Sequence, residues 1–202
     1  MDHASSASGP IPEHEYTSTG LNHRKILMWA FLGSDCLFFG SLISTYTIYR
    51  NHSLVGPFPQ EIFDIPYTSV SAFVLLMSSL TMVLALAAIQ RGDIPGMRVW
   101  LIATGLLGTV FVGGQVYEFT GFIRDGLSLS KNLFGTTFFV LTGFHGAHVT
   151  VGIIILFSLV LNSLRGAIQQ KDSLVVEIAG LYWHFVDVVW IVIFTVVYLL
   201  PY

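Results

Sequence analysis

Five long apolar runs, separated by short polar stretches, constrain the fold of this chain more than any other feature. Each run is roughly 23 to 29 residues long, enough to span a hydrocarbon core about 30 Å thick. The bilayer interior cannot hydrogen-bond stray backbone groups, so each run is predicted to be a helix. The alternating pattern of a membrane β-strand is absent from the sequence. The chain is therefore predicted to be an all-α integral membrane bundle of five transmembrane helices, with these runs: Ile26 to Tyr49, Tyr67 to Ile89, Val99 to Phe122, Leu133 to Leu161 and Val175 to Leu200.

The composition supports a membrane location and excludes several kinds of protein. Charged residues make up 10% of the chain and the mean hydropathy is +0.72, whereas a soluble domain carries about 25% charged residues. The formal net charge of -3 is small, so no nucleic-acid partner is predicted. The single cysteine, Cys36, excludes an intrachain disulfide and any site that needs two thiolates.

Residues 1–25 are polar and lack the apolar core of a signal peptide, so we expect a cytoplasmic tail followed by a transmembrane domain over residues 26–202. Cytoplasmic loops of membrane proteins carry an excess of Lys and Arg. With the amino terminus cytoplasmic, that side holds Arg24, Lys25, Arg91, Arg98, Arg165 and Lys171, and the outer side holds Arg50, Arg124 and Lys131. An odd number of crossings then places Tyr202 outside.

Five titratable residues within the apolar runs fall at similar depth. At about 1.5 Å of rise per residue, Asp35 and His184 lie about 14 Å and Asp187 about 18 Å above the cytoplasmic edge. On the same scale His145 and His148 lie about 15 and 10 Å below the outer edge. A charge at mid-membrane costs about 2.5 to 3.5 kcal/mol, and such groups normally pair with one another. We therefore predict a structural polar layer in which carboxylates accept hydrogen bonds from imidazoles. Small residues are expected to let the first, fourth and fifth helices approach closely there: Gly33, Gly40, Ser44, Gly143 and Ala147.

The same residues leave two other interpretations open. HGAH and HFVD each offer two ligands at positions i and i+3, and helix bundles can combine such pairs into a zinc or bis-imidazole haem site. A stand-alone intramembrane metal-binding or haem-binding protein would be of this kind. Histidines in membrane helices are also common interhelical contacts, so we expect no metal on this chain. The third interpretation is a proton pathway.

Several other residues are candidate sites. Gln115 and Glu118, in GGQVYEF, lie nearer the outer interface and are predicted to form a separate outer-side polar site. Trp183 and Trp190 are one heptad apart in the fifth run, and we expect packing or lipid contacts rather than a redox relay. Basic residues at run ends can bind lipid headgroups or act only as topological charges: Arg24, Arg91 and Arg98.

Two long blocks carry a family resemblance. GTTFFVLTGFHGAHVTVG (135–152) and YWHFVDVVWIVIFTVVY (182–198), preceded by GQVYEF, resemble subunit III of the haem-copper respiratory oxidases. The similarity extends across nearly everything after the tail. SDCLFF (34–39) resembles the first-helix motif of this family, in which many members carry Glu where this chain has Asp35. The helix count is similar to that of the five-helix bacterial form, which lacks the first two helices of seven-helix members.

The resemblance implies an accessory role in an oxygen-reducing, proton-pumping complex of the bacterial inner membrane. In this family subunit III holds no haem or copper, packs beside catalytic subunit I, binds lipid in a cleft, and helps sustain proton uptake and turnover. The implied partners are subunit I directly, subunit II, a small subunit IV and membrane phospholipid, with haem and copper on the partner subunits. TGFHGAHV resembles the cytochrome c oxidase form, which we favour, whereas SDC with EIFDIP resembles the quinol oxidase form. An accessory protein of a related nitric oxide reductase is a smaller alternative.

Overall fold

The computed structural model describes residues 22–50, 63–127 and 133–200, and their main elements are long helices. These are α1 (His23–Tyr49), α3 (Ile65–Gln90), α4 (Ile94–Arg124), α5 (Leu133–Leu164) and α6 (Ser173–Phe194). A short 3₁₀ turn, Gln170–Asp172, leads into α6, and a π-helical turn, Thr195–Leu199, extends it. Five spans in the described part of the chain are long and apolar enough to cross a membrane, so the predicted fold class is confirmed. Because α1 begins at His23, the last residues of the expected tail are helical, and residues 1–21 of that tail lie outside the described residues.

Polar caps and glycines set the helix ends. The side chains of Asn22, Asp64 and Asp93 accept hydrogen bonds from backbone N–H groups in the first turns of α1, α3 and α4, which would otherwise lack partners in lipid. Gly92 has a φ of 82° between α3 and α4, and Gly166 has a φ of 76° after α5. Residues with a side chain rarely adopt this left-handed backbone conformation, which glycine tolerates at a helix end.

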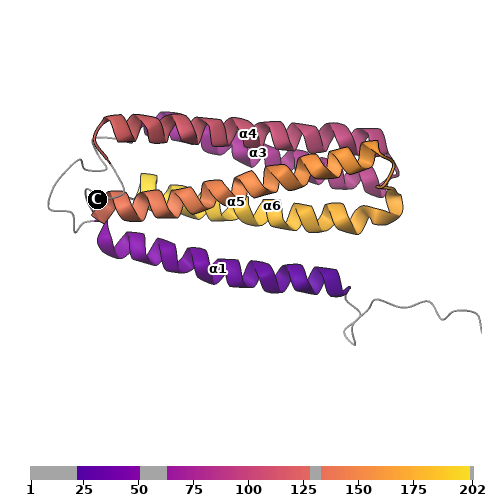
Figure 1. Ribbon diagram of the computed structural model, residues 1–202, viewed down its shortest axis with the longest axis horizontal. Coiled ribbons are helices and arrows are strands. Elements are labelled where there is room, and N and C mark those ends of the chain that lie inside the picture. Colours follow the sequence, from indigo (N-terminus) through magenta and orange to yellow (C-terminus); the bar gives the residue numbers. More distant parts are fainter. Residues whose placement is uncertain (1–21, 51–62, 128–132, 201–202) are drawn as a thin grey trace, which may run out of the picture.

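The helices form a compact four-helix group with α1 along one side (Figure 1). The α3–α4 hairpin packs against α5 and α6, and α1 packs against α5 and α6. In the apolar window of α1 11% of the residues are buried, compared with 50% in the last span. α1 is therefore the least buried of the five described spans.

The closest helix contacts occur at glycines that face a tryptophan. A Cβ added to Gly108 of α4 would lie 2.5 Å from Trp183 Cη2, and one added to Gly152 of α5 would lie 2.8 Å from Trp183 Cζ3. The indole of Trp183, on α6, is 1% exposed and fills the space that both glycines leave. Glycine is needed at these two positions because any side chain would occupy the volume of the ring.

The prediction of a close helix contact through the small residues of α1 (Gly33, Gly40, Ser44) and of α5 (Gly143, Ala147) is wrong. A Cβ added to Gly33, Gly40 or Gly143 would meet no described atom within 4 Å, and Ser44 and Ala147 are exposed. The physical reason is the rotation of α1 about its axis. Leu32, Phe39 and Tyr46 are the buried residues of this helix, so its glycines point away from the bundle.

Candidate functional site

One polar pair connects α1 to α5. His148 Nε2 lies 3.4 Å from Asp35 Oδ2, and both side chains are largely buried. The other ring nitrogen, Nδ1, is 2.7 Å from the carbonyl oxygen of Phe144 and must be the donor, because a carbonyl only accepts. A favourable contact between Nε2 and Asp35 therefore needs a proton on that nitrogen or on the carboxyl group. Phe39 packs on the imidazole in a T-shaped arrangement, with ring centroids 5.0 Å apart.

A second polar group connects α3 to α6 through a serine. Ser79 Oγ is 2.9 Å from His184 Nδ1 and donates a hydrogen bond to Asp187 Oδ2. A hydroxyl has one proton, and Ser79 gives it to the carboxylate, so Nδ1–H of His184 is the donor to Ser79. The result is a directional chain from His184 through Ser79 to Asp187. Ser79 was not predicted from the sequence, because a serine in an apolar helix usually bonds its own backbone and gives no distinct signal.

His145 belongs to neither polar group. It is fully buried, and its ring stacks on Trp190, with centroids 5.0 Å apart and planes inclined by 23°. Phe111 and Phe39 approach it edge-on at 6.0 and 6.5 Å. The predicted layer is thus divided: the structure brings Asp35 to His148, and His184 to Asp187 through α3, but it leaves His145 in an aromatic enclosure.

The two predicted tryptophans are buried and pack inside the bundle. Each is 1% exposed. Trp183 Nε1 donates to Ser78 Oγ of α3 over 2.9 Å, and Trp190 packs between His145 and Phe111, whose centroid is 4.8 Å from that of the indole. Both side chains therefore contact protein rather than lipid.

The outer-side pair lies on one face of α4. Glu118 is 8% exposed and accepts a 2.7 Å hydrogen bond from Thr68 Oγ1. It lines a polar cavity of about 480 Å³, which we call the outer-side cavity. Gln115, one turn earlier, is 6% exposed. The other side chains of the cavity include Asp64, Tyr67, Tyr117, Arg124 and Asp125.

The basic residues at the helix ends opposite the outer-side cavity differ in their exposure and in their contacts with protein. Arg98 is bonded to protein, since its Nε donates to Ser163 Oγ over 2.8 Å and a terminal nitrogen donates to the Ser163 carbonyl over 2.6 Å. This places a cation at the carboxyl end of α5, where the helix dipole favours it. Arg24 and Arg91 are exposed. Lys25, which the sequence analysis treated only as a topological charge, pairs with Glu177 of α6 at 2.5 Å.

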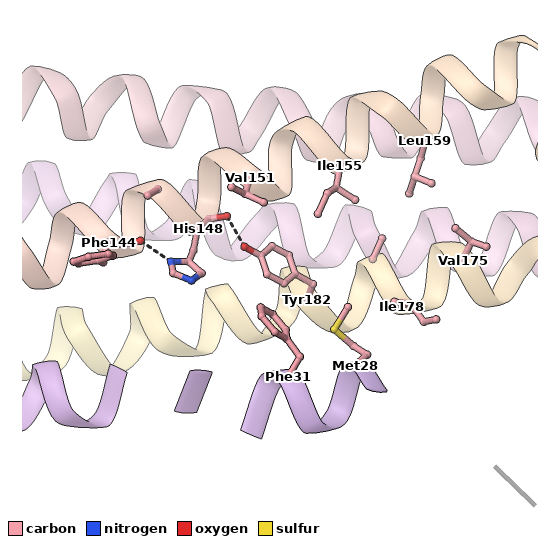
Figure 2. Close-up of a pocket in the computed structure, with 12 residues that line it drawn as sticks. Met28, Phe31, Phe144, His148, Val151, Ile155, Leu159, Val175, Ile178 and Tyr182 are labelled. Carbon is pink, nitrogen blue, oxygen red and sulfur yellow. Dashed lines mark hydrogen bonds between the residues drawn. The ribbon is translucent and has the colours of Figure 1, made fainter. Parts of the chain in front are cut away.

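An apolar groove of about 570 Å³ lies between α1, α5 and α6. Figure 2 shows Met28 and Phe31 of α1 on one side and Ile155 and Leu159 of α5 on the other. His148 lies at one end, beside Phe144. The hydroxyl of Tyr182 reaches in from α6 and donates to the His148 carbonyl over 2.9 Å.

The described residues contain no group of three His, Cys, Asp or Glu side chains that could hold a metal ion. Fold and sites together define a multi-pass helical membrane protein whose intramembrane polar residues mostly contact one another.

The sequence model of the family described as cytochrome c oxidase subunit III matches residues 18–202, and the chain belongs to this family. It is thus a subunit III of a haem-copper oxidase, and subunit III does not itself carry the redox centres.

The relatives include subunits of both quinol oxidases and cytochrome c oxidases. Quinol oxidase subunit 3 of Bacillus subtilis (strain 168) is 37% identical over 201 residues, 99% of this chain and 98% of the relative. Cytochrome c oxidase subunit 3 of Bacillus sp. (strain PS3) is 35% identical over 189 residues, 94% of this chain and 91% of the relative. That of Thermostichus vulcanus is 37% identical over 179 residues, 88% and 87% of the two chains. The identities are too similar to select the electron donor.

Proposed function

We propose that this chain is a non-catalytic subunit that packs on subunit I, holds membrane phospholipid, and supports proton uptake and stable turnover of the oxidase. Membership of the subunit III family supports the accessory role. The groove between α1, α5 and α6 is the observation that carries the lipid part of the proposal.

The groove has the dimensions and lining that suit one acyl chain. It runs along α5 from Phe144 to Leu159, about 22 Å at 1.5 Å per residue. The hydrocarbon core is about 30 Å thick, so one leaflet occupies about half of that depth. The groove is longer than this half. Its lining is almost entirely apolar, so burying an acyl chain there leaves few polar groups unsatisfied. Because α1 buries little of its own surface, such a chain would also supply packing contacts that hold α1 against the bundle.

Filling the groove with a side chain tests this proposal. Ala147 lines the groove and is exposed within it, so Ala147→Phe places a ring where the acyl chain would lie. Native mass spectrometry of the intact complex should then show loss of a bound phospholipid, and subunit III should dissociate faster during turnover. Ala30→Phe, an equally large change on the exposed surface of α1 outside the groove lining, is the matched control. An unchanged lipid count in Ala147→Phe would contradict the lipid assignment.

We also propose that the protein lies in the bacterial inner membrane with its amino terminus in the cytoplasm. The distribution of Lys and Arg supports this orientation. A phosphatase reporter fused after Tyr202 should be active, because that enzyme works only on the outer side, and the same reporter fused after Arg91 should be inactive. The reverse pattern would invert the topology.

For the electron donor we propose cytochrome c, on the basis of the TGFHGAHV block. The purified complex should consume oxygen with reduced cytochrome c and not with quinol. Oxygen consumption with quinol alone would overturn this choice of donor and would leave membership of the subunit III family untouched.

A further inference from the structure

Four buried polar side chains on α4, α5 and α6 have at least one atom without a hydrogen-bond partner among the described residues. The atoms are Nδ1 and Nε2 of His145, Nε1 of Trp190, Nε2 of Gln115 and Oδ1 of Asp187. Their residues are 0%, 1%, 6% and 3% exposed, respectively. They lie inside the bundle, whereas the lipid groove lies on its surface beside α1.

Ring stacking, a close backbone contact and helix register relate the four side chains in pairs. The rings of His145 and Trp190 are stacked with centroids 5.0 Å apart. Asp187 precedes Trp190 by three residues on α6, so the two share a helix face about 4.5 Å apart along the axis. The side chain of Gln115 lies against the backbone next to His145, since a Cβ added to Gly146 would be 3.0 Å from its Oε1.

The same line continues toward the outer-side cavity. Glu118 follows Gln115 by three residues on α4, which is again about 4.5 Å of rise on one face. Glu118 is bonded to Thr68 and lines the cavity. The polar groups therefore form a series of steps of about one helical turn, from Asp187 near the middle of the bundle to the cavity.

The chemistry of these buried atoms without partners identifies the ligand. Trp190 Nε1 and Gln115 Nε2 can only donate, the carboxylate oxygen of Asp187 accepts, and a neutral imidazole does one of each. Water both donates and accepts, so it complements this mixed set, whereas a metal ion would meet two N–H donors. Buried polar groups in native proteins are satisfied by protein or by ordered water. One water with hydrogen bonds of about 2.8 Å joins atoms up to about 5.6 Å apart, which is comparable to the axial rise of about 4.5 Å between Asp187 and Trp190 and between Gln115 and Glu118.

We infer that His145, Trp190, Gln115 and Asp187 bind ordered water, and that this water connects Asp187 through His145 and Gln115 to Glu118 and the outer-side cavity. His184 and Ser79 extend the same hydrogen-bonded series from Asp187 toward the other half of the membrane. The subunit then contains a continuous polar path of its own, made from residues that do not line the lipid groove.

A density map of the intact complex in a lipid nanodisc, at a resolution that shows ordered water, tests this inference. We expect peaks within about 3.2 Å of a ring nitrogen of His145 and of Trp190 Nε1, and a further peak between Gln115 and Glu118. In His145→Phe the peak beside residue 145 should be lost. Thr142→Val is the matched control, because Thr142 lies one turn away on α5, is buried, and bonds its own backbone at Phe138; it should keep every peak.

The map of the unmodified complex decides the question even if His145→Phe fails to assemble. A map that resolves other buried waters but shows none at His145 would overturn the water site. A ring nitrogen of His145 bonded directly to a protein side chain would do the same. Water at His145 with no peak between Gln115 and Glu118 would overturn the path to the cavity.

Discussion

Replacement of Gly108 by alanine should destabilise the subunit, because the added methyl group has no space. Its Cβ would lie 2.5 Å from Cη2 and 3.0 Å from Cζ2 of Trp183, and 3.2 Å from Cγ1 of Ile153. The indole cannot move away easily. Gly152 contacts its opposite edge, and its Nε1 is held by the hydrogen bond to Ser78.

The expected magnitude follows from these contacts. Overpacking a well-filled core typically costs about 1 to 3 kcal/mol, and a shift of the indole that breaks its hydrogen bond adds about 1 kcal/mol. The higher helix propensity of alanine returns up to about 1 kcal/mol. The net destabilisation of Gly108→Ala should therefore be about 1 to 3 kcal/mol.

The assay is thermal dissociation of subunit III from the purified complex in mild detergent. The amount of subunit III that stays bound is measured after heating to a series of temperatures, and the midpoint is the temperature at which half of it has dissociated. Gly113→Ala is the matched control, since Gly113 is on the same helix and a Cβ there would meet no described atom within 4 Å. In the double variant Gly108→Ala/Trp183→Phe the smaller ring should remove part of the penalty, which a double-mutant cycle measures. Equal midpoints for Gly108→Ala and Gly113→Ala would refute the packing argument.

Four further substitutions test the polar contacts, each by the same dissociation assay. Asp187→Leu should weaken retention by about 1 to 3 kcal/mol, because the hydroxyl of Ser79 loses its acceptor in the bundle; wild-type retention would count against it. Arg98→Leu should also lower the midpoint, since it removes two hydrogen bonds to Ser163 at the end of α5. An unchanged midpoint would show that these hydrogen bonds do not contribute to retention of the subunit. Asp35→Leu should lower the midpoint more than Lys25→Ala, because the side chain of Asp35 is more buried than that of Lys25. The opposite order would contradict the expectation that the more buried pair contributes more.

The helices of this protein could be predicted because length and hydropathy are sufficient signals in a membrane. Each predicted run lies within or nearly within an observed helix, and α4 starts at Ile94 rather than Val99 because Asp93 caps it. The depth of the polar residues could also be estimated, since the rise per residue is fixed. Family membership came from long motif blocks, which need no geometry.

The rotation of each helix could not be predicted for a physical reason. A soluble helix shows its buried face by apolar periodicity, whereas a membrane helix is apolar all round. The sequence therefore gave no indication that Gly33 and Gly40 point away from the bundle, or that α3 contributes Ser79 between His184 and Asp187. It also could not show that His145 and His148, three residues apart, enter different environments.

The attachment of α1 links these observations. In lipid the hydrophobic effect does not drive helices together, so association depends on packing and on polar contacts. α1 has little buried surface, and two of its polar contacts to the bundle lie at different depths, Lys25 with Glu177 near one end and Asp35 with His148 further in. The first pair is about one-third exposed and is screened by solvent, whereas the second is shielded. The inner pair and the occupant of the adjoining groove should therefore determine together how firmly α1 is held.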